Sequence, residues 1–205
     1  MVVASISGLI LAGGQSRRLQ ELGPVDKGLL ELAGQPLVQR AVNALSPYVS
    51  QVWISANQNI EQYAHYGQVL ADDSSLGSWQ GPLVGILTAL ERSSDEWLMC
   101  LPVDSPFVPN HLIPTLMQAA MQHPDKKAFY VRAERVHPLC LLIHHSAAPA
   151  LRAYLEAGER RVQTWLKQID AQAVDFGTEA ETQFANINSV QDWQQAQQRW
   201  ANVMR

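Results

Sequence analysis

A glycine pair near the start of the chain is followed by cations at a spacing that suits phosphate binding. Gly13 and Gly14 come directly after an apolar segment, and Arg18 and Lys27 follow in the next loop. Glycine allows backbone dihedrals closed to other residues and lets main-chain N–H groups approach phosphate oxygens. The fixed charges would strengthen that contact, although an ordinary strand-to-helix turn with solvated cations is the alternative. Neither common phosphate fingerprint is present, which indicates a different kind of nucleotide loop.

Asp104 is the candidate metal ligand, because it directly follows a second apolar segment. Residues 97–103 are almost wholly apolar, as a strand buried on both faces would be. Open α/β folds bind ligands at the carboxyl ends of their strands. Mg²⁺, which accompanies nucleoside triphosphates, is held by one or two carboxylates together with phosphate oxygens. An aspartate before Ser-Pro also suits a simple turn, so both roles stay open.

Three other polar residues follow predicted strands and could complete this site. Asn186 and Asn188 come after Phe184, which has strand character, and precede a terminal helix. Their amide oxygens could complete a divalent-metal site or cap that helix. Asp72 follows a short apolar segment, where its carboxylate could read a base edge or make a turn.

Composition limits the class of protein. The 205 residues, 47% of them hydrophobic, predict one domain over 1–205, and a net charge of −4 argues against a nucleic-acid partner. Cys100 and Cys140 lie in apolar runs without metal-site spacing, which predicts reduced core thiols. The first residues lack the features of a signal peptide, and apolar runs are too short to span a membrane. We therefore expect a cytoplasmic protein without membrane contact.

Short apolar segments alternate with amphipathic ones, which predicts strand–helix–strand units around a mostly parallel sheet. The terminal helix carries Trp193 and Trp200, whose helical spacing favours core packing over a protein-docking surface. The expected strands are 7–12, 49–55, 69–71, 97–103, 127–132, 138–144 and 173–176. The expected helices are 36–45, 81–90, 110–121, 148–156, 162–168 and 191–203.

The motifs occur together in an order that resembles a known family. The chain is similar, over about 7–193, to the molybdenum cofactor guanylyltransferases, within the nucleotidyltransferases that build activated sugars and cofactors. The resemblance rests on the Leu-Ala-Gly-Gly-x-Ser-x-Arg loop, Asp26-Lys27-Gly28, Pro-x-Asp-Ser-Pro around Asp104, His137-Pro138, the segment 154–162 and Asn186-x-Asn188.

The resemblance implies a three-layer α/β/α sandwich with a Rossmann-like, mostly parallel sheet of the nucleotide-diphospho-sugar transferase type. About 1–108 would bind the nucleotide and about 109–205 the acceptor. The implied reaction transfers GMP from GTP to the terminal phosphate of Mo-molybdopterin with Mg²⁺, releasing pyrophosphate and giving the molybdopterin guanine dinucleotide cofactor.

The resemblance also implies roles for individual residues. The nucleotide would be bound by Leu11, Ala12, Gly13, Gly14, Lys27, Ser55, Asp72 and Asp104. Arg18, Lys27 and Asp104 would be catalytic, and the metal would lie on Asp104 and Asn188. The acceptor would be bound by His137, Glu159, Arg160, Arg161 and Asn186.

Two other functions fit the same residues. A cytidylyltransferase for the same cofactor, or a sugar-1-phosphate nucleotidyltransferase, would keep the fold and change the base pocket around Ser55 and Asp72. A non-catalytic nucleotide-binding protein that delivers the cofactor is the third possibility, which the presence of both Lys27 and Asp104 disfavours. We expect a monomer that makes transient contacts with molybdopterin-synthesis proteins and apo-molybdoenzymes.

Overall fold

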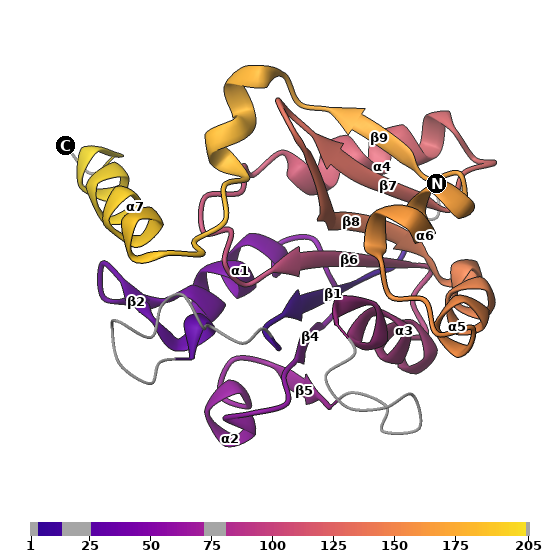
Figure 1. The fold of residues 1–205 in the computed structure, drawn as a ribbon, viewed down its shortest axis with the longest axis horizontal. Coiled ribbons are helices and arrows are strands. Elements are labelled where there is room, and N and C mark those ends of the chain that lie inside the picture. Colours follow the sequence, from indigo (N-terminus) through magenta and orange to yellow (C-terminus); the bar gives the residue numbers. More distant parts are fainter. Residues whose placement is uncertain (1–3, 14–25, 72–80, 204–205) are drawn as a thin grey trace.

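The computed structural model describes residues 4–13, 26–71 and 81–203, and a seven-stranded sheet forms its centre (Figure 1). Gly14, Arg18 and Asp72 lie outside the described residues. The strand order is β5-β4-β1-β6-β8-β7-β9. The strands are β1 (Ile6–Leu11), β4 (Val52–Ser55), β5 (Gln68–Leu70), β6 (Trp97–Pro102), β7 (Ala128–Arg132), β8 (Val136–His144) and β9 (Gln172–Asp175).

The prediction of a mostly parallel sheet is confirmed. β5, β4, β1 and β6 run parallel to one another, and β7 runs parallel to β9, whereas β8 is antiparallel to both β6 and β7. Leu11 pairs with Ser55 on one side and with Pro102 on the other. The carboxyl ends of β1, β4 and β6 therefore lie at one edge of the sheet, where the loops carrying the candidate site residues begin.

Helices cover both faces of the sheet. They are α1 (Leu37–Leu45), α2 (Ile60–Tyr63), α3 (Pro82–Arg92), α4 (Leu112–Gln122), α5 (Ala148–Glu156), α6 (Val162–Gln168) and α7 (Val190–Val203). The short 3₁₀ helices are η2 (Lys27–Leu29), η4 (His145–Ala147) and η5 (Thr178–Gln183), and β2 (Glu31–Leu32) pairs with β3 (Gln35–Pro36).

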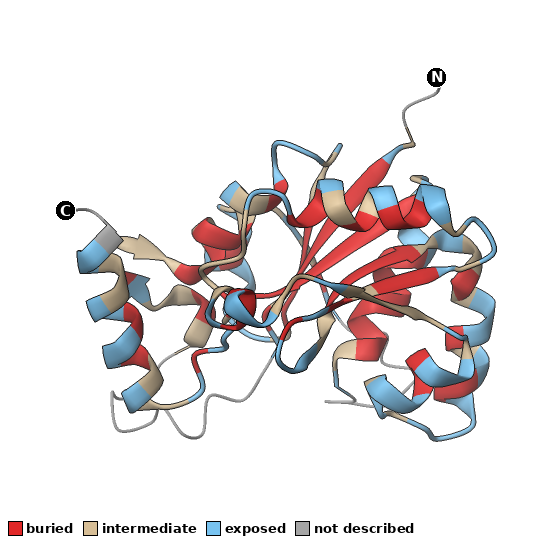
Figure 2. Cartoon of the chain, turned by 90° about the horizontal axis from the view of Figure 1, so that it is seen from above, coloured by how far each residue is buried: buried red, intermediate tan, exposed pale blue. Residues whose placement is uncertain are grey.

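Successive side chains of β1 point to opposite faces of the sheet, and each face carries its own hydrophobic core. Ile10 packs with apolar residues of α1 and α4 on one face, and Leu9 packs with α3, α5 and α6 on the other. Figure 2 shows the central strands buried between helices whose outer surfaces are exposed. The three-layer α/β/α sandwich is confirmed. None of the helices in the described part of the chain is both long and apolar enough to cross a bilayer.

Two of the detailed expectations have clear outcomes. Cys100 and Cys140 are free and buried, and burial raises the pKa of the Cys140 thiol to about 12, so the core-thiol prediction is confirmed. The strand character assigned to Phe184 is wrong. Phe184 ends the 3₁₀ helix η5 and is fully buried against the ring of Phe176. A single apolar residue carries no periodicity, so its burial could not distinguish a strand from a helical turn.

Candidate active site

Three predicted site residues from distant parts of the chain meet at the carboxyl edge of the sheet. The Lys27 Nζ donates to Asp104 Oδ2 and to Asn188 Oδ1, at 2.9 Å in each case. The side chains of Lys27 and Asp104 are 16% and 14% exposed, so the ion pair is partly shielded from water. Asn188 is exposed, so the partly buried cation and carboxylate meet an amide oxygen at the surface of the protein, where a charged ligand could reach all three.

Hydrogen bonds between two loops hold Asn188 near Asp104. The Ile187 N–H donates to the Asp104 carbonyl at 2.9 Å, and the Ser105 hydroxyl donates to Asn186 Oδ1 at 2.7 Å. Ser105 is buried and Ile187 is part of the core. The loop after β6 and the loop before α7 are therefore linked by hydrogen bonds, and the predicted acceptor residue Asn186 accepts one of them.

A capping box fixes the start of α7 and with it Asn188. Asp192 accepts hydrogen bonds from the N–H groups of Asn188 and Ser189, at 2.8 Å each, and its own N–H donates to the Ser189 hydroxyl. Burial raises the pKa of Asp192, but these hydrogen bonds and the charge of Lys27 outweigh burial and lower the pKa overall. Asp192 is therefore held as an anion close to the Lys27 ammonium.

The residues present fit a Mg²⁺ ion. Asp104 Oδ1 is buried and has no hydrogen-bond partner among the described residues. Such an oxygen costs free energy unless a donor or a cation reaches it. Carboxylate and amide oxygens are ligands that Mg²⁺ accepts, and the ion commonly takes its other ligands from water and phosphate. Asp104 and Asn188 are therefore suitable to hold the metal.

The nucleotide candidates on the first strands lie at the same edge. The Ala12 N–H donates to the Ser55 carbonyl at 2.9 Å, and the Val103 N–H donates to the Leu11 carbonyl at 3.1 Å. These bonds extend the pairing of β1 past its end. The side chain of Ser55 is buried beside Gly85 of α3, where an added Cβ would lie 2.3 Å from the Ser55 hydroxyl oxygen.

Gly13 does not use the unusual dihedrals that its sequence context suggested. Its φ lies outside the positive region that favours glycine. A Cβ added there would meet the Asn57 amide nitrogen at 3.8 Å, which is ordinary contact. Because it has no side chain, Gly13 leaves open space beside its backbone, and this is what it offers a ligand rather than an unusual backbone conformation.

The acceptor candidates are divided between the two faces of the sheet. His137 packs against Phe184, in the core that contains α1 and α4. Glu159, Arg160 and Arg161 lie between α5 and α6, which belong to the opposite core. Arg160 donates to the carbonyls of Leu155 and Glu159, at 2.6 and 2.7 Å, and so closes its own turn.

Glu181 is a buried anion that sequence reasoning missed, and it holds His137. It accepts hydrogen bonds from His137 Nε2 at 3.0 Å, from the Arg135 N–H at 3.1 Å and from Arg135 Nε at 2.8 Å. Burial raises the pKa of Glu181, but these bonds outweigh burial and lower the pKa to about 2. The carboxylate is therefore an anchor for Arg135, just before β8, and for His137 at the start of that strand.

We expect Glu181→Gln to lower the free energy of unfolding by about 2 kcal/mol at pH 7, the scale of hydrogen bonds to a charged group. Because folding lowers the pKa from 4.5 to about 2, the stabilisation is present above pH 4.5 and is lost as the pH falls through that range. Denaturant unfolding between pH 7 and 2.5 measures the difference. Glu134→Gln, at an exposed position, is the control. A difference that is independent of pH would contradict this account.

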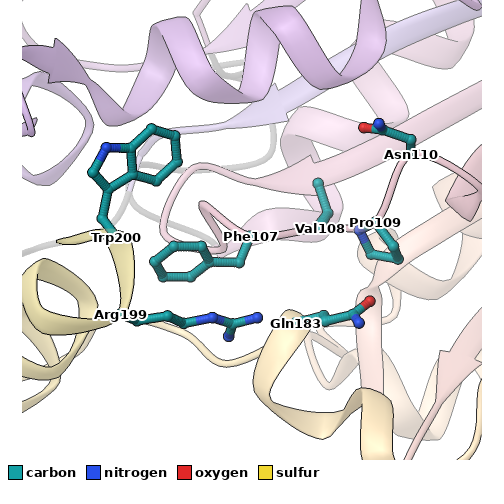
Figure 3. Close-up of a pocket in the computed structure, with 7 residues that line it drawn as sticks. All are labelled: Phe107, Val108, Pro109, Asn110, Gln183, Arg199 and Trp200. Carbon is teal, nitrogen blue, oxygen red and sulfur yellow. The ribbon is translucent and has the colours of Figure 1, made fainter. Parts of the chain in front are cut away.

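Helix α7 is attached to the rest of the chain by contacts between arginine side chains and aromatic rings. Figure 3 shows Phe107, Arg199 and Trp200, which belong to these contacts. The Arg40 guanidinium lies 3.9 Å from the centre of the Trp200 ring, and that of Arg199 lies 4.3 Å from the Phe107 ring. A cavity of about 280 Å³ lies along this seam, lined by Phe107, Val108, Pro109, Asn110, Gln183, Arg199 and Trp200. Trp193 is buried. Both tryptophans therefore pack inward, and the prediction of core packing is confirmed.

We expect Trp200→Ala to destabilise the attachment of α7 by about 2 kcal/mol, since it removes a partly desolvated cation–π pair and its packing. Arg40, which is buried, would also lose the ring that covers it. Hydrogen exchange of the α7 amides measures the effect, with the exposed Gln198→Ala as the control. Unchanged protection in Trp200→Ala would show that the seam does not hold the helix.

Four contributors to the site were not assigned a role from the sequence. They are Asp192 and three residues joined by hydrogen bonds beside Lys27, namely Asp26, Asn59 and Tyr63. Asp192 had a usable signal, because Ser-x-x-Asp before a helix is a capping-box pattern. Asp26 was part of a quoted motif but received no function. Tyr63 had no signal, because nothing in the sequence relates a tyrosine to an aspartate 37 positions earlier.

Comparisons with known proteins agree on one family. The family model described as MobA-like NTP transferase domain matches residues 8–173. A molybdenum cofactor guanylyltransferase from Pasteurella multocida (strain Pm70) is 42% identical over 191 residues, covering 93% of this chain and 98% of that protein. A protein of the same name from Haemophilus influenzae (strain ATCC 51907 / DSM 11121 / KW20 / Rd) is 38% identical over 188 residues, covering 92% and 95%.

Solved structures support the fold. Molybdopterin-guanine dinucleotide biosynthesis protein A from Archaeoglobus fulgidus superposes with a TM-score of 0.74 at 21% identity, covering 96% of this chain and 99% of that one. A CMP:2-keto-3-deoxy-manno-octonic acid synthetase complexed with CTP gives 0.76 at 14% identity, covering 97% and 99%. At such identities the likeness concerns the fold alone, which is that of nucleotidyltransferases.

Proposed function

This chain belongs to the MobA-like NTP transferase family and is a nucleotidyltransferase of molybdenum cofactor biosynthesis, and we propose that it transfers GMP from GTP to the terminal phosphate of Mo-molybdopterin. The observation that carries the proposal is the Lys27 ammonium bonded to both Asp104 and Asn188 at 2.9 Å. The family membership favours a catalyst over a non-catalytic delivery protein.

The reaction needs positioning and charge neutralisation more than proton transfer. An oxygen of the acceptor phosphate forms a bond to the α-phosphorus of GTP, and the bond from that phosphorus to the bridging oxygen breaks, so that pyrophosphate leaves with the electron pair. The acceptor phosphate is already an anion at neutral pH and needs no general base. Lys27 would bind phosphate oxygens and stabilise the charge that develops on them.

Asp104 and Asn188 would hold Mg²⁺, whose chemistry is to neutralise phosphate charge and to polarise the phosphorus–oxygen bonds. The buried Asp104 Oδ1, without a partner in the described part of the chain, supports this role. Arg18 and Asp72 stay candidates for phosphate and guanosine contacts. His137, Asn186 and Glu159 to Arg161 stay candidates for the pterin side. A monomeric state, a cytoplasmic location and transient contacts with molybdopterin-synthesis proteins and apo-molybdoenzymes also stay predictions.

The choice of substrates is tested by pyrophosphate release from GTP and from CTP, each with molybdopterin and with sugar 1-phosphates, in the presence of Mg²⁺. We expect turnover with GTP and molybdopterin only. Turnover with CTP alone would replace the guanylyl assignment with a cytidylyl one, and turnover with a sugar 1-phosphate would change the acceptor. Tight GTP binding without pyrophosphate release would support the delivery protein instead.

A further inference from the structure

The turn that carries Lys27 is tied to a distant part of the chain through Asp26. The Asp26 Oδ1 accepts hydrogen bonds from the Gly28 N–H at 3.1 Å and from the Tyr63 hydroxyl. Its Oδ2 accepts a hydrogen bond from the Asn59 side-chain amide at 2.8 Å. The Gly28 bond caps the 3₁₀ helix η2, whose first residue is Lys27. The two side-chain bonds come from outside this turn, so they fix where the whole turn sits.

Tyr63 attaches Asp26 to the hydrophobic core. It is fully buried, and burial followed by the neighbouring Asp26 carboxylate raises the pKa of its phenol. The hydroxyl therefore keeps its proton at neutral pH and acts as the donor. A Cβ added to Gly28 would lie 2.3 Å from the Tyr63 hydroxyl oxygen. The Lys27 turn thus lies directly against the tyrosine, at a distance that only glycine permits.

Asn59 connects this turn to the loop after β4. It adopts a left-handed conformation, with φ of 51°, directly before α2, and it is the fourth residue after the end of β4 at Ser55. Asparagine tolerates this conformation better than most residues. Because β4 lies beside β1, the loop after β4 borders the same sheet edge as the Lys27 turn (Figure 1).

We propose that Tyr63 and Asn59 are positioning residues. From α2 and from the loop after β4 they hold Asp26, and they thereby direct the Lys27 ammonium toward the reacting phosphate. The proposal rests on the proposed function for the role of Lys27 in turnover, but the placement of Lys27 can be measured without turnover. A charged acceptor with three donors in a partly buried setting is a rigid anchor, since each bond to a carboxylate is stronger than a neutral one. The lysine needs such an anchor because its own side chain is flexible.

The kinetic test compares Tyr63→Phe in two backgrounds. In the otherwise unchanged protein we expect kcat to fall about tenfold, with the KM for GTP within about twofold of its starting value. In a Lys27→Ala background the same change should have almost no further effect on kcat, because there is no lysine left to position. Tyr48→Phe, which removes a hydroxyl bonded to the Asn110 carbonyl, is the matched control. An equal fall in both backgrounds indicates a structural role and overturns the proposal.

The hydrogen bond from Asn59 to Asp26 is tested by exchanging the two residues. Asn59→Asp places two carboxylates face to face and should lower kcat about tenfold. Adding Asp26→Asn restores one donor and one acceptor and keeps the net charge of the original pair, so kcat should return to within about threefold of the starting protein. Aspartate also tolerates the left-handed conformation of position 59. If the kcat of the double variant is no higher than that of Asn59→Asp, the proposed role of Asn59 is overturned.

A measurement without catalysis separates this inference from the proposed function. The rate at which acetic anhydride acetylates Lys27, followed by peptide mass spectrometry, should rise at least threefold in Tyr63→Phe and in Asn59→Asp and stay unchanged in Tyr48→Phe. Lys126 supplies an internal reference in the same samples. Absence of nucleotidyl transfer in the unchanged protein would refute the proposed function alone. Unchanged labelling of Lys27 in both variants would instead overturn the proposal that Tyr63 and Asn59 position Lys27.

Discussion

Replacing Lys27 with alanine is expected to lower guanylyl transfer at least about a hundredfold, the scale on which one preorganised charge-stabilising donor contributes. Lys27 is the cation that the structure brings within 2.9 Å of both Asp104 and Asn188. Its removal leaves the carboxylate without its ammonium partner and the reacting phosphates without that charge. Since alanine cannot carry a charge, added Mg²⁺ should not restore the rate.

The measurement is steady-state pyrophosphate release with GTP and molybdopterin, together with thermal unfolding. Lys126→Ala is the control, because Lys126 also forms an ion pair, with Asp170, but at the surface. Surface ion pairs contribute little, so its rate and unfolding temperature should both stay near those of the unchanged protein. A Lys27→Ala enzyme within a few fold of the normal rate would remove Lys27 from the site.

The partners in the Lys27 site were largely predictable because each has an independent signal. Asp104 follows a wholly apolar strand, Lys27 follows a glycine loop, and parallel strands bring their following loops to one edge. Asn188 was harder, since its place after the supposed strand at Phe184 fitted a metal site and a helix cap alike, and that strand is absent. Its loop is held at the site because it bonds to the Asp104 carbonyl through Ile187.

The parts that sequence reasoning missed depend on contacts with no local pattern. The bond from Tyr63 to Asp26 joins two loops that no periodicity relates. Glu181 lies in a polar stretch that gives no sign of burial, yet it is the anion that holds His137. Gly13 looked special for its dihedrals, whereas Gly28 and Gly85 are glycines that close approaches require. Propensity and periodicity describe segments, and these features are set by how segments pack.

Replacing Asp104 with alanine is the second change expected to lower transfer at least about a hundredfold. The carboxylate is the partly buried counter-charge of Lys27, and its Oδ1 is the oxygen without a hydrogen-bond partner in the described ranges. Alanine removes the proposed metal ligand and one of the two hydrogen-bond acceptors that the described residues offer the Lys27 ammonium. Asp104→Asn keeps the shape but not the charge and should lose nearly as much, which distinguishes electrostatics from packing.

Binding of Mn²⁺ provides a readout for Asp104 that does not depend on turnover. With GTP present, Asp104→Ala should bind Mn²⁺ at least about tenfold more weakly, because one of the two protein ligands proposed for the ion is gone. Asp175→Asn, at an exposed ion pair with Arg132, should bind it normally. If Asp104→Ala turns over normally, Asp104 is not catalytic. If it is inactive but binds Mn²⁺ as tightly as before, Asp104 acts through Lys27, since the carboxylate then serves to hold the ammonium and the ion lies elsewhere.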